Sequence, residues 1–157
     1  MKVLFVCMGN ICRSSSAHGV FQDLVNREGL QEHFEIDSCG TLDFHTGDAP
    51  DPRSQKTAKA RGFDISYLRA RQFNQHDFKH FDYVLAMDND NLRELHRACP
   101  AELRDRIELF CPYATQFSER EVPDPYYGGP QGFEHVFDLV LDASEGLLKH
   151  IRERNFT

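Results

Sequence analysis

The fold is decided by residues 3–16, which read VLFVCMGNICRSSS. Residues 3–6 form an uninterrupted apolar run, which is typical of a strand buried on both faces of a parallel sheet. The next segment, from Cys7 to Arg13, is too short and too rich in turn-forming residues to be a strand or a helix. Serines at 14–16 then favour the start of a helix, whose apolar residues recur on one face up to Val25. This stretch therefore predicts a strand, a tight loop and a helix.

The alternation of strands and helices continues to the end of the chain. Further strand-like runs lie at residues 34–38, 83–87 and 107–110. Further helices are expected from Asp51-Pro52 to about Gly62, between Asp88 and Pro100, and along residues 133–151. This order predicts an α/β fold, a three-layer sandwich in which helices flank a four-stranded, twisted parallel sheet. Functional sites in such sheets lie at the carboxyl ends of the strands.

Composition narrows the class of protein. The 157 residues carry 18 lysines and arginines against 25 aspartates and glutamates, a net charge of −7. We expect one domain over residues 1–157, and no binding to nucleic acid, which needs a concentrated basic surface. No apolar run approaches the roughly 18 residues of a membrane span, and we recognise no signal peptide. Five cysteines, an odd number, indicate free thiols and a cytoplasmic location.

Cys7 and Arg13 flank the loop after the first strand, and together they indicate phosphate chemistry. Backbone N–H groups of such a loop can converge on an anion at a helix N-terminus. The guanidinium of Arg13 can bind two phosphate oxygens at once. The same dipoles and positive charge favour a thiolate at Cys7, which could attack phosphorus. We therefore predict a phosphate-binding loop and transfer of a phosphoryl group to sulfur, followed by hydrolysis.

This reaction needs a proton donor for the leaving group, and Asp124 is the candidate. It lies in residues 122–129, VPDPYYGG, where prolines on both sides stiffen its backbone. Aromatic rings beside a carboxyl create a partly dry environment that suits a general acid, and Tyr126 and Tyr127 follow Asp124 closely. The two tyrosines could also line a pocket deep enough for an aromatic substrate ring.

These two segments resemble the signatures of the low-molecular-weight protein tyrosine phosphatases. The likeness covers nearly the whole chain, because shorter matching segments lie between the signatures in the expected order. They are Asp37-Ser38 with Gly40-Thr41, Asp51-Pro52-Arg53, Ala70-Arg71-Gln72, and Met87-Asp88 with Asn91-Leu92. The resemblance implies hydrolysis of protein phosphotyrosine and small aryl phosphates, with no metal and no organic cofactor.

The resemblance also implies a role for each candidate site residue. Cys7 would be the nucleophile, Arg13 the phosphate clamp, and Asp124 the general acid that later activates water. Ser14 would donate a hydrogen bond to the Cys7 sulfur and help it leave. The other candidates would bind phosphate, support the loop or wall the pocket: Met8, Gly9, Asn10, Ile11 and Cys12 in the loop, Ser38 as support for Asn10, and Phe44, Tyr126 and Tyr127 as aromatic walls.

The partners implied by the resemblance are phosphotyrosine-containing proteins, with inorganic phosphate as product and inhibitor. By analogy with bacterial relatives, a cognate tyrosine kinase is a candidate partner.

Three positions depart from the family pattern. Ser15 stands where a proline usually opens the first helix, and His18 where an acidic residue is common. Leu68 stands where many relatives carry a histidine that supports the phosphate loop, a hydrogen bond that leucine cannot make. We therefore expect the network around Asn10 to be satisfied differently.

Simpler interpretations stay open for several candidates. Cys7 could be a small buried residue, Asp124 part of an ordinary turn, and Ser14 only a helix cap. Packing on the core is the alternative for Tyr126 and Tyr127, and a buried plug is the alternative for Phe44.

Two further pairs allow more than one interpretation. Cys12 could form a reversible disulfide with Cys7 or face the interior as a small apolar residue. His76 and His80 are spaced like a metal-binding pair on a helix, but no further ligands recur at suitable spacing. We expect these two histidines to be solvated surface residues.

Two other functions remain as alternatives. An arsenate reductase shares the fold and the first signature, but it needs two more thiols close together, and Cys99 and Cys111 lie in different expected elements. A phosphate- or phosphotyrosine-binding module that lost turnover is the non-enzymatic alternative, supported only by the changes at Ser15, His18 and Leu68.

Overall fold

The computed structural model describes residues 1–126 and 128–155. Its elements follow the predicted alternation of strands and helices. In chain order they are β1 (Lys2–Cys7), α1 (Arg13–Arg27), η1 (Gln31–His33), β2 (Glu35–Gly40), α2 (Pro52–Ala60), α3 (Gln75–His80), β3 (Tyr83–Ala86), α4 (Asn89–Ala98), η2 (Ala101–Arg106), β4 (Ile107–Leu109), η3 (Cys111–Tyr113) and α5 (Pro130–Asn155).

The four strands form one parallel sheet in the order β2-β1-β3-β4, which confirms the predicted fold class. β1 is a central strand, and Phe5 pairs with Ser38 on one side and with Leu85 on the other. Because all strands are parallel, their carboxyl ends meet at one edge of the sheet. Cys7 at the end of β1 and the segment that follows β3 therefore lie at the same edge.

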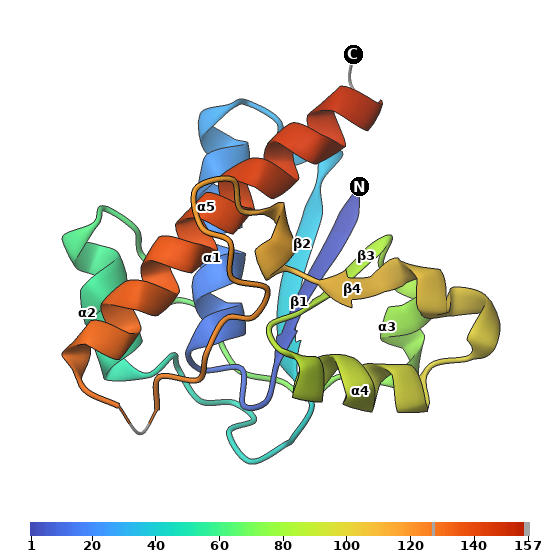
Figure 1. Ribbon diagram of the computed structural model, residues 1–157, viewed down its shortest axis with the longest axis horizontal. Coiled ribbons are helices and arrows are strands. Elements are labelled where there is room, and N and C mark those ends of the chain that lie inside the picture. The colour runs from blue at the N-terminus through green and yellow to red at the C-terminus, as the bar shows by residue number, and fades with distance from the viewer. Residues whose placement is uncertain (127, 156–157) are drawn as a thin grey trace.

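Helices cover both faces of the sheet in three layers (Figure 1). Alternate residues of β1 point to opposite faces, as expected for a strand. Val3 and Phe5 pack in the larger core cluster with residues of α1 and α5, and Leu4 and Val6 pack in a second cluster with residues of α3 and α4. The strand is buried on both sides, which explains its unbroken apolar sequence.

Helix positions agree with the sequence apart from Ser14, the extra helix α3 and the ends of α5, which extends beyond the expected residues 133–151 on both sides. Asp51 and Asp88 cap α2 and α4 as predicted, since each carboxylate accepts a hydrogen bond from a backbone N–H of the first turn. Ser14 lies inside α1 because this helix begins at Arg13, so the interpretation of Ser14 as a helix cap is wrong. Helix α3 was not predicted, because six residues are too few to show a helical period.

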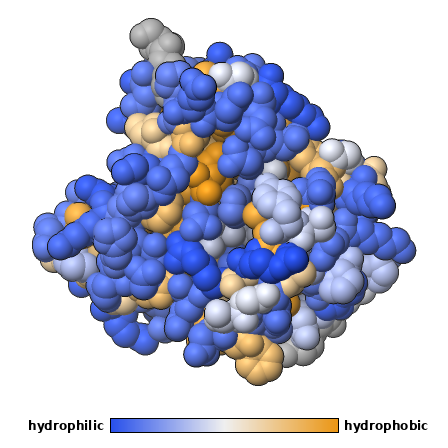
Figure 2. All heavy atoms as spheres, turned by 180° about the vertical axis from the view of Figure 1, so that it is seen from behind, coloured by the Kyte–Doolittle hydropathy of each residue, from blue (hydrophilic) through white to orange (hydrophobic). Residues whose placement is uncertain are grey.

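The surface turned away from the viewer in Figure 1 is largely hydrophilic, with a small hydrophobic recess near its middle (Figure 2). Among the described residues, no helix combines the length and the apolar character that crossing a membrane would require.

Candidate active site

The loop between β1 and α1 is fixed against the end of β2. Thr41 donates its backbone N–H to the carbonyl of Cys7 at 2.9 Å, and Leu42 donates to the carbonyl of Met8 at 3.0 Å. Gly40 permits this close approach, because a Cβ atom there would lie only 2.6 Å from the carbonyl oxygen of Met8. The glycine at the end of β2 therefore lets the second strand support the loop.

Asn10 holds the loop in its curved shape. Its φ is 60°, in the left-handed region that asparagine tolerates better than most residues. The side chain donates to Oγ of Ser14 at 2.8 Å and accepts from the backbone N–H of Arg71 at 3.0 Å. These contacts satisfy the amide group without a side chain at position 68, and Leu68 packs in the core instead.

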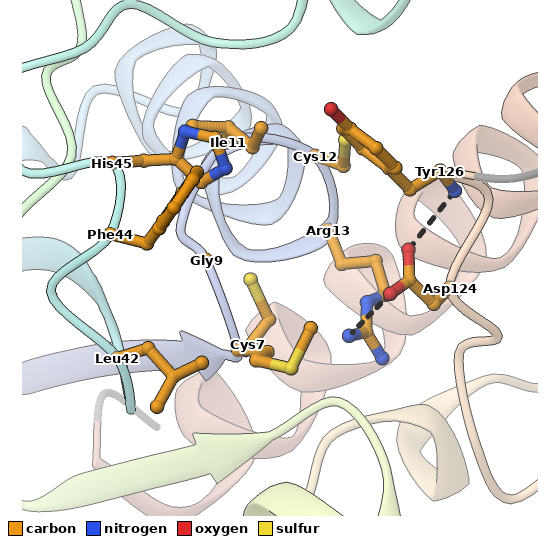
Figure 3. A pocket seen from close by; sticks show the side chains of 11 residues that line it. Cys7, Gly9, Ile11, Cys12, Arg13, Leu42, Phe44, His45, Asp124 and Tyr126 are labelled. Carbon is orange, nitrogen blue, oxygen red and sulfur yellow. Dashed lines mark hydrogen bonds and ion pairs between the residues drawn. The ribbon is translucent and has the colours of Figure 1, made fainter.

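The sulfur of Cys7 points into a pocket (Figure 3) and lies within hydrogen-bond distance of two polar groups. Oγ of Ser14 lies 3.0 Å from Sγ, and the backbone N–H of Asn10 donates to it at 3.2 Å. The sulfur also lies close to the N-terminus of α1, whose dipole is favourable to negative charge. Cys7 is thus a nucleophile candidate held at the edge of the core, and the interpretation of a merely buried small residue does not fit this orientation.

Arg13 is the first residue of α1, and its guanidinium is held from behind. Nη1 donates to Oδ2 of Asp88 at 2.5 Å and to the carbonyl of Val122 at 3.1 Å. Burial alone would lower the pKa of Arg13, but attraction to Cys7, Asp88 and Asp124 outweighs it and raises the pKa. The side chain therefore remains a fixed positive charge beside the sulfur.

Asp124 reaches the other side of the same pocket. Its Oδ1 accepts from the backbone N–H of Tyr126 at 3.0 Å, and its Oδ2 lies 3.8 Å from Nη2 of Arg13. The side chain is 37% exposed, so its surroundings are less dry than the sequence suggested. An Asx-type hydrogen bond, more than burial, sets the orientation of this carboxyl group.

The pocket has a volume of about 350 Å³ and brings together most of the predicted site residues. Phe44 is 82% exposed at the rim, so it is no buried plug, and Tyr126 is 38% exposed on the opposite side. His45 and Leu42 line the pocket as well and were not predicted. The predicted residues that line it are Cys7, Met8, Gly9, Ile11, Cys12, Arg13, Phe44, Asp124 and Tyr126.

The other predicted site residues lie outside the lining. Asn10 and Ser14 support the loop from behind, and Tyr127 lies outside the described residues. Ser38 does not contact Asn10 as expected: its hydroxyl lies 2.8 Å from Nδ1 of His18, and Asn10 is held by Ser14 and Arg71. The prediction that Ser38 supports Asn10 directly is therefore wrong.

Position 15 shows how the chain tolerates a serine in place of the usual proline. The hydroxyl of Ser15 donates to the carbonyl of Cys12 at 3.2 Å, and that of Ser16 donates to the same carbonyl at 2.6 Å. Two side-chain hydrogen bonds thus tie the start of α1 to the end of the loop.

Cys12 is buried beside Ile11, Ala70 and Phe133. Burial, with the nearby carboxylates of Asp51 and Asp124 adding to it, raises the pKa of the Cys12 thiol to about 12. Cys12 is therefore a thiol at neutral pH. The five cysteines are all free, and a disulfide between Cys7 and Cys12 stays a prediction.

Two functional side chains were not recognised in the sequence. Asp88 was predicted only as a cap, yet one of its oxygens caps α4 while the other holds Arg13. Its position directly after β3, at the edge where β1 ends, was a usable signal.

Arg53 links Asp51 to the carbonyl of Tyr126 at 3.1 Å, and its guanidinium lies 5.1 Å from the centre of the Tyr126 ring.

The described residues contain no group of three or more histidine, cysteine, aspartate or glutamate side chains arranged for a metal ion. His80 pairs with the carboxylate of Glu35 at the surface.

A family model described as low molecular weight phosphotyrosine protein phosphatase matches residues 2–156. The chain belongs to this family. A low molecular weight phosphotyrosine protein phosphatase of Schizosaccharomyces pombe is 45% identical over 152 residues, which cover 96% of this chain and 97% of that protein. The resemblance seen in the two signatures is therefore confirmed, and the family is one of hydrolases.

Solved structures of the family agree with the fold. A protein tyrosine phosphatase from Entamoeba histolytica superposes with a TM-score of 0.95 at 42% identity, covering 99% of both chains. A structure described as a Drosophila arginine phosphatase superposes with a TM-score of 0.88 at 33% identity, covering 97% of this chain and 98% of that one. Members of this phosphatase fold are thus named for different phosphorylated groups.

Proposed function

We propose that this phosphatase hydrolyses phosphotyrosine in proteins through a phosphocysteine intermediate. The observation that carries the proposal is the placement of the Cys7 sulfur in one pocket with Arg13 and Asp124. A nucleophile, a fixed cation and a carboxyl group converge on a space of about 350 Å³, which is large enough for a phosphorylated aromatic ring.

In the first step, the thiolate of Cys7 attacks phosphorus. A bond forms between sulfur and phosphorus while the bond from phosphorus to the tyrosyl oxygen breaks. Arg13 and backbone N–H groups of the loop between β1 and α1 bind the phosphoryl oxygens and stabilise their charge in the transition state. Protonated Asp124 gives its proton to the departing phenolate, so tyrosine leaves as a neutral phenol.

In the second step, the carboxylate of Asp124 accepts a proton from a water molecule whose oxygen attacks phosphorus. The bond between phosphorus and sulfur breaks, and Ser14, 3.0 Å from Sγ, stabilises the returning thiolate. Inorganic phosphate is released. It occupies the same loop as the substrate phosphate, so it also acts as a competitive inhibitor.

Neither alternative function has comparable support. A reductase would need two thiols that relay oxidation from Cys7, but Cys99 and Cys111 belong to the clusters on opposite faces of the sheet. A binding module without turnover would not need Asp124 placed 3.8 Å from Arg13. The Drosophila arginine phosphatase makes phosphoarginine a substrate to be tested beside phosphotyrosine.

The test is rapid-mixing hydrolysis of p-nitrophenyl phosphate at mildly acid pH, followed by assays on peptides with phosphotyrosine, phosphoserine or phosphoarginine. We expect a burst of p-nitrophenol that approaches one equivalent per enzyme, and turnover of the phosphotyrosine peptide in preference to the other two. Binding of phosphate without a burst or turnover would favour the binding module, and a preference for phosphoarginine would overturn the substrate class.

Three finer points belong to the same proposal. The substrates are phosphotyrosine-containing proteins, among which a cognate tyrosine kinase is one candidate by analogy. Five free cysteines favour a reducing compartment, the cytoplasm, as the place where the enzyme acts. We also propose that residues 1–157 act as one domain, since β1, α1 and α5 share one core cluster.

A further inference from the structure

Exposed apolar side chains are concentrated around one opening of the molecule. Among the described residues, the exposed large hydrophobic side chains are Met8 at 44%, Leu42 at 50%, Phe44 at 82%, Tyr67 at 57% and Tyr126 at 38%. All of them except Tyr67 line the pocket that contains Cys7. Apolar side chains that gather in this way on a surface mark a place where another molecule is bound.

The rim has two sides that come from separate segments. Leu42 and Phe44, from the loop after β2, border the pocket opposite Asp124 and Tyr126 (Figure 3). Met8 lies next to Leu42, because the backbone N–H of Leu42 donates to the carbonyl of Met8 at 3.0 Å. Both exposed side chains line the pocket that contains Cys7, and we call this pair of residues the apolar shelf.

This shelf lies where the neighbours of a phosphotyrosine would be placed. The phosphate must reach the sulfur inside the pocket, so the tyrosine ring fills the opening and the peptide backbone runs along the rim. The side chains next to phosphotyrosine then come to rest on the rim residues. A small aryl phosphate has no such neighbours and leaves the shelf uncovered.

The side of the opening that carries Leu42 and Phe44 is acidic, whereas Arg53 places a positive charge beside Tyr126 on the other side. Residues 41–50 contain Asp43 and Asp48 and no lysine or arginine, and Asp124 lies on the opposite side. His45 also lines the pocket, and its Nδ1 lies 3.1 Å from Oδ2 of Asp48. Carboxylates that flank a phosphotyrosine would therefore meet like charges and an apolar surface, both of which disfavour them.

We propose that the shelf of Met8 and Leu42 binds an apolar side chain adjacent to phosphotyrosine and selects protein substrates with apolar, non-acidic flanks. This inference rests on the proposed phosphotyrosine phosphatase activity and adds the sequence around the phosphorylated residue. The occupant is a segment of the substrate protein with a residue such as leucine directly beside the phosphotyrosine.

The test compares three phosphotyrosine peptides that differ only in the residues on both sides of phosphotyrosine, which are leucine, alanine or glutamate. Each methylene group that the shelf removes from water is worth about fourfold in kcat/KM. With partial burial, we expect leucine flanks to exceed alanine flanks by about five- to tenfold, and glutamate flanks to fall below alanine.

The Leu42→Ala variant should lower the leucine-to-alanine ratio by about two- to fourfold, since Met8 remains on the shelf. The Leu42→Asp variant should bring the ratio below unity, because the new carboxylate lies on the shelf. Tyr67→Ala removes an exposed large hydrophobic side chain outside the pocket lining, and this variant should keep the wild-type ratio. The ratio is taken within each variant, so differences in the amount of active enzyme cancel.

The outcomes separate this inference from the function on which it rests. If wild-type enzyme hydrolyses p-nitrophenyl phosphate and all three peptides at equal rates, the shelf proposal is overturned while the phosphatase activity stands. A leucine preference that stays unchanged in Leu42→Ala also overturns it. If no phosphotyrosine substrate is hydrolysed, the proposed function itself has failed.

Discussion

Asp88 holds Arg13 by one carboxylate oxygen while its other oxygen caps helix α4. Oδ2 lies 2.5 Å from Nη1 of Arg13, and Oδ1 accepts from the backbone N–H of Asn91 at 2.8 Å. Arg13 is almost fully buried and Asp88 is 20% exposed, so water screens this ion pair little. The orientation of the phosphate clamp therefore depends on a residue at the end of the neighbouring strand.

Asp88→Asn tests this dependence. Asparagine caps a helix as well as aspartate does, but it removes the charge that orients the guanidinium. A hydrogen bond to a charged group contributes about 1.5–3 kcal/mol, so we expect kcat/KM for p-nitrophenyl phosphate to fall by about 10- to 100-fold. Steady-state kinetics measures the loss, and unchanged kcat/KM would contradict the role given to Asp88.

Asp88→Ala is the matched comparison. This variant removes the cap as well as the charge. Urea titrations should give it a free energy of unfolding about 1 kcal/mol lower than that of Asp88→Asn. The two variants should lose activity equally, because the cap contributes to stability and the charge to the clamp.

Asp124→Asn should slow the release of poor leaving groups far more than good ones. The amide keeps the oxygen that accepts from Tyr126 at 3.0 Å but cannot donate a proton to phenolate. General acid catalysis contributes about 10²- to 10⁴-fold, and we expect losses near this range for phenols of high pKa. A series of aryl phosphates measures the trend, and equal slowing across it would argue against proton donation by Asp124.

Arg53 should act on the same step through the position of Asp124. It binds the carboxylate of Asp51 at 2.8 Å and the carbonyl of Tyr126 at 3.1 Å, and Asp51 in turn donates its N–H to Ile11. We expect Arg53→Ala to slow aryl phosphates with poor leaving groups by roughly tenfold and good ones little, since the acid loses its fixed position.

The matched control is Arg69→Ala. Within residues 1–126 and 128–155, Arg69 donates to the carbonyls of Ser66 and Leu68 alone, so its loss changes the net charge equally without removing a contact to the loop of Asp124. Its leaving-group series should superimpose on that of the wild type. If both arginine variants show the same rates, Arg53 has no positioning role.

His18 should make the fold sensitive to acid. Burial, together with the positive charge of Arg71, lowers the pKa of His18 to about 4 despite the nearby carboxylate of Asp37. An unfolded histidine has a pKa of about 6.5, so below this value the unfolded chain binds a proton that the folded chain does not. The stability associated with neutral His18 is complete above pH 6.5 and is lost as the pH falls towards 4.

His18→Asn isolates this contribution, because the asparagine amide can keep the hydrogen bond to Ser38. Between pH 7 and pH 5, the free energy of unfolding of the wild type should fall by about 2 kcal/mol more than that of the variant. Urea titrations at the two pH values measure the difference. Equal losses would show that His18 titrates normally in the folded protein.

Much of the fold could be predicted because local patterns determine it. The apolar run of β1 is buried on both faces, and Asp51 and Asp88 cap the helices that follow them, as their positions in the sequence suggested. Gly40 was harder to interpret. Position 40 requires glycine because the carbonyl of Met8, which is distant in sequence, would clash with a Cβ atom there.

The site could be predicted only where its residues are close in sequence. Cys7, Arg13 and Ser14 lie in one segment, whereas the contact from Arg13 to Asp88 joins residues 75 positions apart. To predict this contact one must know that β3 lies beside β1 in the sheet. The periodicity of apolar residues in the sequence does not reveal the strand order. The expected contact from Ser38 to Asn10 is not made, because His18 on the facing helix α1 takes the hydroxyl of Ser38.

The central claim is that the Cys7 sulfur carries the phosphoryl group, and trapping that intermediate tests it most directly. The Asp124→Asn variant is mixed with p-nitrophenyl phosphate, quenched in acid, digested and examined by mass spectrometry. We predict one phosphoryl group on the peptide that contains Cys7, and neither this adduct nor turnover in Cys7→Ser. A phosphoryl group on another residue, or hydrolysis by Cys7→Ser, would contradict the account.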